Sequence, residues 1–379
     1  MSGPLSGLRV IEMGAMGPGP FAAMMLADMG AEVIRVDRAE EARRGRSTRA
    51  DIHLRGRQSI ALDLKQPQGV EVVLRLAERA DALIEGFRPG VMERLGLGPA
   101  ECQARNPKLT YARMTGWGQD GPYAQMPGHD INYIAVSGAL NSIGRAGGPP
   151  VPPHGLVGDF GGGGTFLAFG VMCAAWETAR SGKGQVIDAS MLEGSAALMT
   201  VTQMLRNQGE WSDQRGTNIV DSGAPFYDTY ETADGRYLAV SAVEEKFYRG
   251  LLRVLQLDPA QLPPQMDRGQ WPAMKQKLAA IFKTRTRDAW LAAFAGEEAC
   301  ISPVLALGEV PADPHVRFRG SYVEFEGQVQ PAPSPRFSRT APSLRPPPAT
   351  IGQDTNAVLA AVGMSRDDIE RLRSAGAIV

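Results

Sequence analysis

Two side chains in the middle of the sequence have the chemistry to move a proton. His129 opens the run HDINYIAV, and Asp159 stands in the glycine-rich run VGDFGGGG. Histidine and aspartate are residue types that can act as general acid or base. Structural alternatives stay open. Asp130 or His129 is placed to cap a helix over 131–140, and an aspartate before a helix, such as Asp159, is often a cap.

A cluster of basic residues precedes this region, and part of it falls where α/β sheets bind ligands. Arg38 follows a predicted strand, while Lys65, Arg88 and Arg94 lie at or soon after the ends of others. Open α/β sheets bind ligands in the crevice outside these strand ends. Cations gathered there suit a phosphorylated ligand through charge-assisted hydrogen bonds. We interpret the run 43–49 as a solvated loop. The cluster consists of Arg35, Arg38, Arg43, Arg44, Arg46, Arg49, Arg55, Arg57 and Lys65.

A glycine-rich loop near the N-terminus gives a weak dinucleotide-binding signal. Residues 17–22 satisfy the GxGxxA spacing, and Asp37 ends the next predicted strand. However, Pro18 and Pro20 remove two backbone N–H donors from the loop that would hold a pyrophosphate. Pro20 is better explained as the first residue of a helix. A nicotinamide cofactor is therefore a minor alternative.

Composition excludes several other classes of function. The chain has 379 residues, 43% of them hydrophobic, and a net charge of −1, which gives no general attraction to nucleic acid or anionic lipid. No run of eighteen or more apolar residues predicts a membrane span, and the N-terminus lacks the pattern of a secretion signal. Three separated cysteines indicate buried thiols in a reducing, cytoplasmic setting. The few histidines have no metal-ligand spacing, so we expect no metal.

Hydrophobic patterning predicts an α/β protein with a Rossmann-like, doubly wound large domain and a smaller α+β domain. Seven prolines between 331 and 348 indicate an extended crossing rather than a core element. We predict a large domain over 1–190, linking helices over 191–221, the small domain over 222–310, and a return segment with C-terminal helices over 311–379. Strands are expected over 8–13, 32–38, 60–65, 81–87 and 109–117, with helices over 21–30, 69–80, about 92–106, and 165–180.

Several blocks of the sequence resemble the class III CoA-transferase family, of the CaiB/BaiF type. The resemblance extends from residue 5 to about 320. Within the family, GHDINY followed by VGDFGGG is most similar to the α-methylacyl-CoA racemases. The other blocks are GPGPFAAMMLADMGAEVIRVDR, SIALDLK, EGFRPGVMERLGLG, MTGWGQDGPY, SGKGQVIDASMLEG and CISPVLALGEV.

The resemblance implies a homodimer of interlocked, ring-like subunits that bind CoA where related sheets bind NAD. It implies a 2-methyl-branched acyl-CoA as substrate and no separate cofactor, because CoA is part of that substrate. The positions that match CoA-contacting segments are Arg38, Leu62, Asp63, Leu64, Lys65, Gly86, Phe87, Arg88, Arg94, Gly128 and Tyr133.

The catalytic residues implied by the resemblance match at individual positions. Transferases of the family use an aspartate nucleophile, matched by Asp159, and racemases add a histidine, matched by His129. Asp130 and Glu244 match acidic residues around the same pocket. One departure is 154–155, which reads His-Gly where racemases often carry an asparagine.

Three alternatives to a racemase stay open. In a CoA-transferase, Asp159 attacks an acyl-CoA to form a mixed anhydride, and His129 is not needed. An acyl-CoA-binding protein without catalysis, and a dehydrogenase, are the others. The Met-rich segments MMLADM and ALMTVTQML are candidates for an apolar acyl surface.

Overall fold

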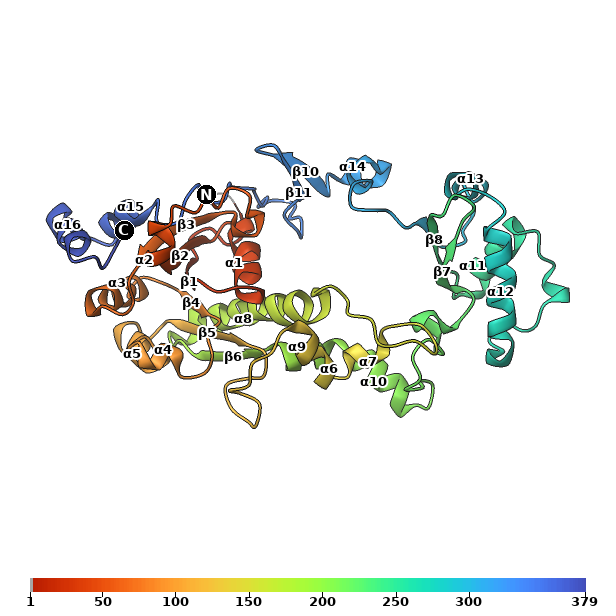
Figure 1. Cartoon of the computed structure of the whole chain (residues 1–379), viewed down its shortest axis with the longest axis horizontal. Coiled ribbons are helices and arrows are strands. Elements are labelled where there is room, and N and C mark those ends of the chain that lie inside the picture. Colours follow the sequence, from red (N-terminus) through yellow and green to blue (C-terminus); the bar gives the residue numbers. More distant parts are fainter. Residues whose placement is uncertain (1–2) are drawn as a thin grey trace. The chain divides into compact units, whose positions relative to one another are not determined.

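The computed structural model of the chain describes residues 3–379, which divide into two compact units (Figure 1). The first unit is assembled from three stretches of sequence: 3–137, His154–Leu198 and Gly320–Val379. The second contains Gly138–Pro153 and Met199–Arg319. The domain limits predicted from sequence, which treat 191–221 as a linking segment, stay predictions.

The first unit is built on a six-stranded sheet whose neighbouring strands are all parallel. The strand order β3-β2-β1-β4-β5-β6 is that of a doubly wound sheet, with its switch point between β1 and β4. The predicted α/β class and Rossmann-like large domain are therefore confirmed. The strands are β1 (Arg9–Met13), β2 (Glu32–Arg38), β3 (Arg57–Leu62), β4 (Ala82–Glu85), β5 (Thr110–Thr115) and β6 (Val186–Ser190).

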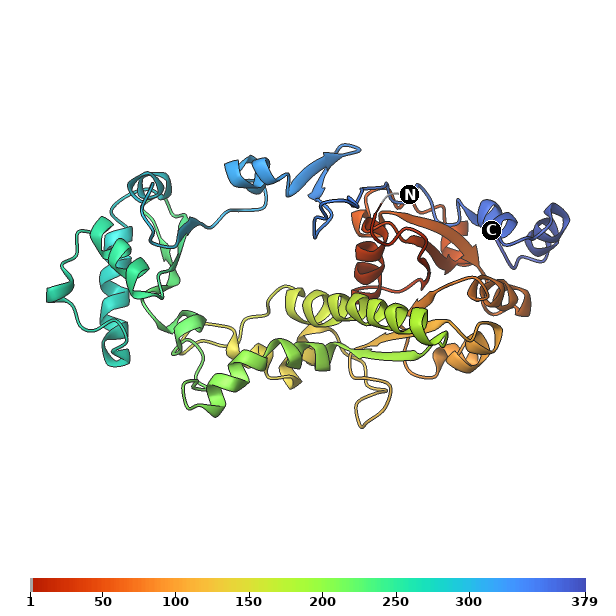
Figure 2. The ribbon, with the colours of Figure 1, turned by 180° about the vertical axis from the view of Figure 1, so that it is seen from behind.

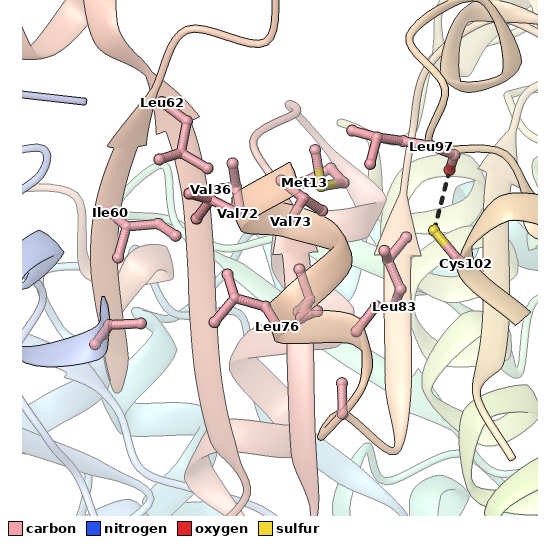
Figure 3. Packing of buried hydrophobic residues seen from close by; sticks show 14 of the residues in the cluster. Met13, Val36, Ile60, Leu62, Val72, Val73, Leu76, Leu83, Leu97 and Cys102 are labelled. Atoms are coloured by element: carbon pink, nitrogen blue, oxygen red, sulfur yellow. Dashed lines mark hydrogen bonds between the residues drawn. The ribbon is translucent and has the colours of Figure 1, made fainter. Parts of the chain in front are cut away.

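Helices cover both faces of this sheet, because successive side chains of each strand point to opposite faces. Val10 packs in one core with α1 and α8, whereas Ile11 packs in the other with α3 and α15. Figure 3 shows the second core, in which Leu76 of α3 lies among side chains of the strands. The helices of this unit are α1 (Pro18–Asp28), α2 (Ala39–Arg43), α3 (Pro67–Ala77), α4 (Val91–Arg94), α5 (Pro99–Arg105), α6 (Asp130–Val136), α8 (Phe166–Ser181), α9 (Met191–Leu198), α15 (Thr355–Ala361) and α16 (Arg366–Ser374).

Several elements differ from the sequence prediction. The helix expected over 131–140 is divided into α6 and α7 (Ala139–Ser142), since Gly138 adopts a φ of +88° between them. Helix α1 begins at Pro18 rather than Pro20, because both prolines fit a first turn whose N–H groups have no intrahelical partner. The single helix expected over 92–106 is divided into α4 and α5, since Gly96 adopts a φ of +72° between them. Strand β3 ends at Leu62 instead of continuing to residue 65.

A π-helix over Leu156–Thr165 continues directly into α8. Phe160 N–H donates to Gly155 O at 3.2 Å, the i→i−5 spacing of a π-helix. The glycine run permits close approach of backbones, as expected from the sequence. A Cβ atom on Gly162 would lie 2.6 Å from the backbone nitrogen of Ser195 on α9.

The continuous helix Leu156–Ser181 is long and apolar enough to cross a bilayer by length and composition, with 39% of its most apolar window buried. Core helices of soluble proteins meet the same test, so it is weak evidence for a membrane span. In this unit α8, the long yellow-green helix of Figure 2, packs on β5, β6 and α1. One stripe of α8 remains open: Phe169 is 67% exposed and Trp176 is 70% exposed.

The second unit has its own antiparallel sheet and core. The predicted hairpin turns at Gly235, which adopts a φ of +72°. Buried aromatic side chains, including Phe226, Trp271 and Phe282, pack between the sheet and its helices. The elements of this unit are β7 (Tyr227–Glu231), β8 (Tyr237–Ser241), β9 (Ile301–Pro303), α7 (Ala139–Ser142), α10 (Thr200–Asn207), α11 (Glu245–Val254), α12 (Trp271–Phe282), α13 (Arg287–Ala293) and α14 (Pro314–Arg319).

The segment with the seven prolines lies in the first unit, after a short hairpin of β10 (Tyr322–Phe325) and β11 (Gln328–Pro331).

The three cysteines only partly match the prediction of buried thiols. Cys102 is buried, and burial raises the pKa of its thiol to about 12. Cys173 and Cys300 are exposed, so the expectation of three buried thiols is wrong for these two.

Candidate active site

Two cavities lie at the carboxyl ends of the parallel strands, on either side of the switch point, where doubly wound sheets bind ligands. The first has a volume of about 790 Å³ and is bordered by the loops that follow β1, β4 and β5. The second has a volume of about 550 Å³ and is bordered by the residues that follow β1, β2 and β3. Phe87, directly after β4, lines both. The two cavities therefore adjoin at Phe87.

The first cavity brings together both proton-transfer candidates. His129 reaches it from the start of α6, and Asp159 reaches it from the first turn of the π-helix. Predicted CoA-contacting residues line the same cavity: Gly86, Phe87, Arg88, Gly128 and Tyr133.

Asp130 holds the backbone of Asp159 in place. Helix α6 begins at Asp130, so the residue at its N-cap is His129. The carboxylate of Asp130 accepts a hydrogen bond from the N–H of Asp159 at 2.8 Å. This N–H belongs to the first turn of a helix, where N–H groups have no intrahelical partner. Gly158 allows the contact, because a Cβ atom there would collide with the Asp130 carboxylate. The predicted cap role of Asp130 is therefore replaced by a bond between two helices.

The environment of Asp159 favours its protonated form. Burial raises the pKa of Asp159, the negative charge of Asp130 raises it further, and His129 acts in the opposite direction. A carboxyl group with a raised pKa is better suited to take up and return a proton near neutral pH. Asp159 is not a cap, because the N-cap of its helix is Gly155.

His129 is held by its backbone rather than by its ring. Its N–H donates to Oδ1 of Asn132 at 3.0 Å, which closes the first turn of α6. The residue is exposed and lines the cavity. His129 is therefore the N-cap of α6, as predicted, and it also lines the cavity.

An aromatic group supports the loop before His129. Tyr133 and Trp117 meet edge to face with ring centroids 4.8 Å apart, and the Tyr133 hydroxyl donates to Gly128 O. Burial raises the pKa of Tyr133, and Asp159 raises it further. Tyr133 therefore stays a neutral hydrogen-bond donor that fixes the residue next to His129.

The second cavity has three cations whose charges are not neutralised by an ion pair within residues 3–379: Arg38, Arg43 and Lys65. The acids of this cavity already have other partners. Asp37 accepts from Arg35 and from Ser59 at 2.8 and 2.7 Å, and Glu40 pairs with Arg44. The cations are thus available to an anionic ligand. The predicted positions Leu62, Asp63 and Leu64 also line this cavity.

The basic cluster divides into three groups. Arg35, Arg55 and Arg57 are buried or nearly so and pair with the buried carboxylates of Glu12 and Asp28. Arg57 also donates to Pro20 O, which fixes the start of α1. The cavity group is Arg38, Arg43 and Lys65, and the surface group is Arg44, Arg46 and Arg49. Arg43 is exposed, as predicted for 43–49, but it ends helix α2 rather than lying in a loop, and it also lines the second cavity.

The loop that begins at Gly86 and carries Phe87, which lines both cavities, is held by the side chain of Glu85. This side chain is buried, and it accepts from Phe87 N–H at 2.7 Å and from Arg113 Nε at 3.1 Å. Burial raises the pKa of Glu85. Sequence patterns do not single out Glu85 or Asn132, since each lies within an ordinary strand or helix pattern.

A third cavity of about 740 Å³ adjoins the first at Gly17. Its walls are mainly apolar and include Phe21, Met24, Met25 and Phe160. Both methionines belong to the MMLADM segment predicted as an apolar surface.

Four candidate residues do not line these cavities. Asp130 reaches the site only through its hydrogen bond with the N–H of Asp159. Arg94 is exposed at the end of α4 and lines neither of the first two. His154 is exposed and adopts a φ of +58° before the π-helix. Glu244 is the N-cap of α11 in the second unit, so its part in the site stays a prediction. Residues 3–379 contain no group of three or more His, Cys, Asp or Glu side chains arranged to hold a metal ion.

Comparisons with known proteins agree with the resemblance seen in the sequence. The chain is 47% identical over 373 residues to the alpha-methylacyl-CoA racemase of Mus musculus and 45% identical over 375 residues to that of Homo sapiens. Each alignment covers 98% of this chain and 96% of the relative. A solved CAIB/BAIF family protein from Brucella suis matches with a TM-score of 0.83 at 26% identity, over 96% of this chain and 100% of that one. The model of CoA-transferase family III matches residues 5–355, and the chain therefore belongs to that family.

Proposed function

We propose that the protein interconverts the (2R) and (2S) forms of a 2-methyl-branched acyl-CoA thioester. The observation that carries the proposal is that His129 and Asp159 line one cavity from two separate helices. The names of the mouse and human relatives support it.

The reaction needs a base on each side of the α-carbon. In one direction Asp159 removes the α-proton and protonated His129 returns one to the opposite face, and the roles reverse for the other enantiomer. Electrons from the broken C–H bond move onto the thioester oxygen to form an enolate. The first turn of the helix Leu156–Ser181 borders the cavity, and the N-terminal end of a helix favours negative charge.

The adjoining cavities accommodate the other parts of this substrate. Arg38, Arg43 and Lys65 suit the phosphates of CoA in the second cavity, and the pantetheine arm passes Phe87 to reach the first. The branched acyl chain enters the apolar third cavity beyond Gly17. With the three parts of the substrate placed in this way, the reaction needs no cofactor besides the CoA of the substrate.

A CoA-transferase is the second candidate, and the description of the family favours it. Asp159 would attack the thioester carbon, release CoA as a thiolate, and hold the acyl group as a mixed anhydride until an acceptor acid takes its place. That reaction requires Asp159 and leaves His129 without a role.

The two functions are separated by substitution of each residue. In a racemase both His129→Ala and Asp159→Ala lower the rate of inversion by about 10²–10⁴-fold, because each turnover uses both groups. Chiral analysis of 2-methylacyl-CoA and α-deuterium incorporation, followed by NMR, measure the loss. His315→Ala, which removes an exposed histidine of the second unit, is the matched control and should keep the wild-type rate.

The racemase and the transferase mechanisms predict different results for these substitutions. A His129→Ala protein that inverts 2-methylacyl-CoA at the wild-type rate contradicts the racemase mechanism. A transferase keeps CoA transfer to an acceptor acid after His129→Ala and loses it after Asp159→Ala.

We also propose that the protein is a homodimer. The open apolar stripe of α8 supports this, because large exposed apolar side chains on one face of a helix, here Phe169 and Trp176, are typical of interaction surfaces.

A further inference from the structure

The free edge of strand β3 is covered by residues from the other end of the chain. β3 is the outermost strand of the sheet. Asp354 and Thr355 contact the strand from Ser59 to Ala61: Ser59 N–H donates to Asp354 Oδ2 at 2.8 Å, and Ala61 N–H donates to Thr355 Oγ1 at 3.2 Å. The segment Gly376–Val379 contacts the carboxyl end of the strand, where Leu62 and Asp63 line the second cavity.

The segment Gly376–Val379 pairs directly with the end of β3. Asp63 N–H donates to Ala377 O at 2.9 Å, and Val379 N–H donates to Ala61 O at 3.2 Å. Leu62 and Ile378 form an antiparallel bridge between these bonds, and Ile378 is only 2% exposed. These bonds fix the chain next to the cavity, because Leu62 and Asp63 line it, as does the cation Lys65 two residues after Asp63.

The same segment also contacts a second cation of this cavity. Arg43, at the end of α2, donates from Nη2 to Gly376 O at 3.0 Å. Gly376 adopts a φ of +73°, a conformation that favours glycine, as the chain leaves α16. A guanidinium has five N–H groups, so this bond orients Arg43 and leaves donors for a ligand. Four consecutive residues thus contact both Arg43 and the strand end that carries Lys65.

We propose that Gly376–Val379 is a positioning segment for the nucleotide end of CoA, and that Arg43 is a phosphate-contacting residue that it orients. The inference rests on the proposed function for the identity of the ligand. Without the segment, Arg43 and Lys65 keep their charges but lose the geometry in which both reach one ligand. The segment acts on substrate affinity rather than on the chemical step, because none of its residues lines the first cavity.

The test compares two thioesters of the same 2-methyl-branched acid, one of CoA and one of pantetheine, which lacks the nucleotide. Three variants are used: Arg43→Ala, Val379→Pro, which removes the N–H donated to Ala61, and deletion of 377–379. Arg46→Ala is the matched control, since Arg46 belongs to the surface group and pairs with Asp51. Circular dichroism identifies any variant that fails to fold. If the deletion variant does not fold, the two point substitutions still test the proposal.

We expect each variant to raise KM for the CoA thioester, by about tenfold for Arg43→Ala, which is the loss of one charge-assisted hydrogen bond. KM for the pantetheine thioester and both kcat values should stay within about twofold of wild type, since the lost contact is equal in ground and transition states. A parallel rise in KM for both thioesters overturns the proposal, because it indicates general loss of structure. Unchanged KM values overturn it as well.

Calorimetric binding of CoA itself separates this inference from the proposed reaction. Weaker binding of CoA by Arg43→Ala and Val379→Pro, with wild-type binding by Arg46→Ala, supports the positioning role even in a protein that does not racemise. Wild-type binding by the two point variants contradicts it. A wild-type protein that binds CoA but exchanges no α-proton contradicts the proposed function alone.

Discussion

At the scale of single residues, the Asp130 carboxylate explains both the position and the acidity of Asp159. Its bond to Asp159 N–H fixes the backbone, and its charge adds to the effect of burial on the pKa of Asp159. Tyr133 and His129 are the other titratable groups that interact with this pair. Asp130 is therefore a positioning residue in our mechanism.

The substitution Asp130→Asn separates the two effects. The asparagine oxygen still accepts from Asp159 N–H, but the negative charge is gone, so the pKa of Asp159 falls. Asp159 must be ionised to act as base, so the acid limb of kcat/KM moves to lower pH. The measurement is the pH profile for the enantiomer that Asp159 deprotonates. Asp120→Asn, an equal change of charge at an exposed position outside the cavity, should leave the limb in place. A shift to higher pH would contradict our account.

Sequence patterns located the residues of the site better than they assigned their roles. Asp159 is the one acid in an apolar, glycine-lined stretch, and His129 matches the histidine of the racemases that the sequence resembles. The structure brings both to one cavity. The roles of Arg43 and Arg57 were not separable, because an arginine in a basic run looks the same whether it is paired with a buried carboxylate or open to a ligand. Partners distant in sequence, Gly376 for Arg43 and Glu12 for Arg57, make the difference.

At the scale of elements, the strands were predictable and the π-helix was not. A buried parallel strand has a short continuous apolar run, as in residues 82–84, which the sequence displays. The glycine run in Leu156–Thr165 has no side chains whose spacing would distinguish i→i−5 from i→i−4 bonding. Packing on α1 and α9 surrounds this segment, and that packing arises only in the folded unit.

The substitution Gly162→Ala tests this packing. The added methyl group would lie 2.6 Å from the backbone nitrogen of Ser195, which cannot rotate away. We expect a loss of about 1–3 kcal/mol in the free energy of unfolding, measured with urea. Gly308→Ala is the control, because nothing lies within 4 Å of its Cβ position and its φ is not positive. Equal stability of the two variants would show that the glycine run is not closely packed.

At the scale of the whole molecule, the open stripe on α8 predicts association of two chains. We expect light scattering to give twice the chain mass of 40.6 kDa. Trp176→Arg should shift the mass toward one chain, since Trp176 is 70% exposed and a charge there disfavours burial against a partner. Arg180→Ala, at an exposed position one turn further along α8, serves as the control. A wild-type protein with the mass of one chain at micromolar concentration would contradict the dimer.

Coverage of the β3 edge in the first unit has to wait until the C-terminal segments have been synthesised. The bond between Ser59 and Asp354 spans 295 residues, and that between Arg43 and Gly376 spans 333. Ribosomes add about 5–20 residues per second, so β3 waits roughly 15–60 s for the segments that cover it. During this interval its N–H and C=O groups are open to strands of other nascent chains, the usual route to aggregation at an uncovered edge. Slower elongation between residues 62 and 354 therefore lengthens the period in which the growing polypeptide is vulnerable.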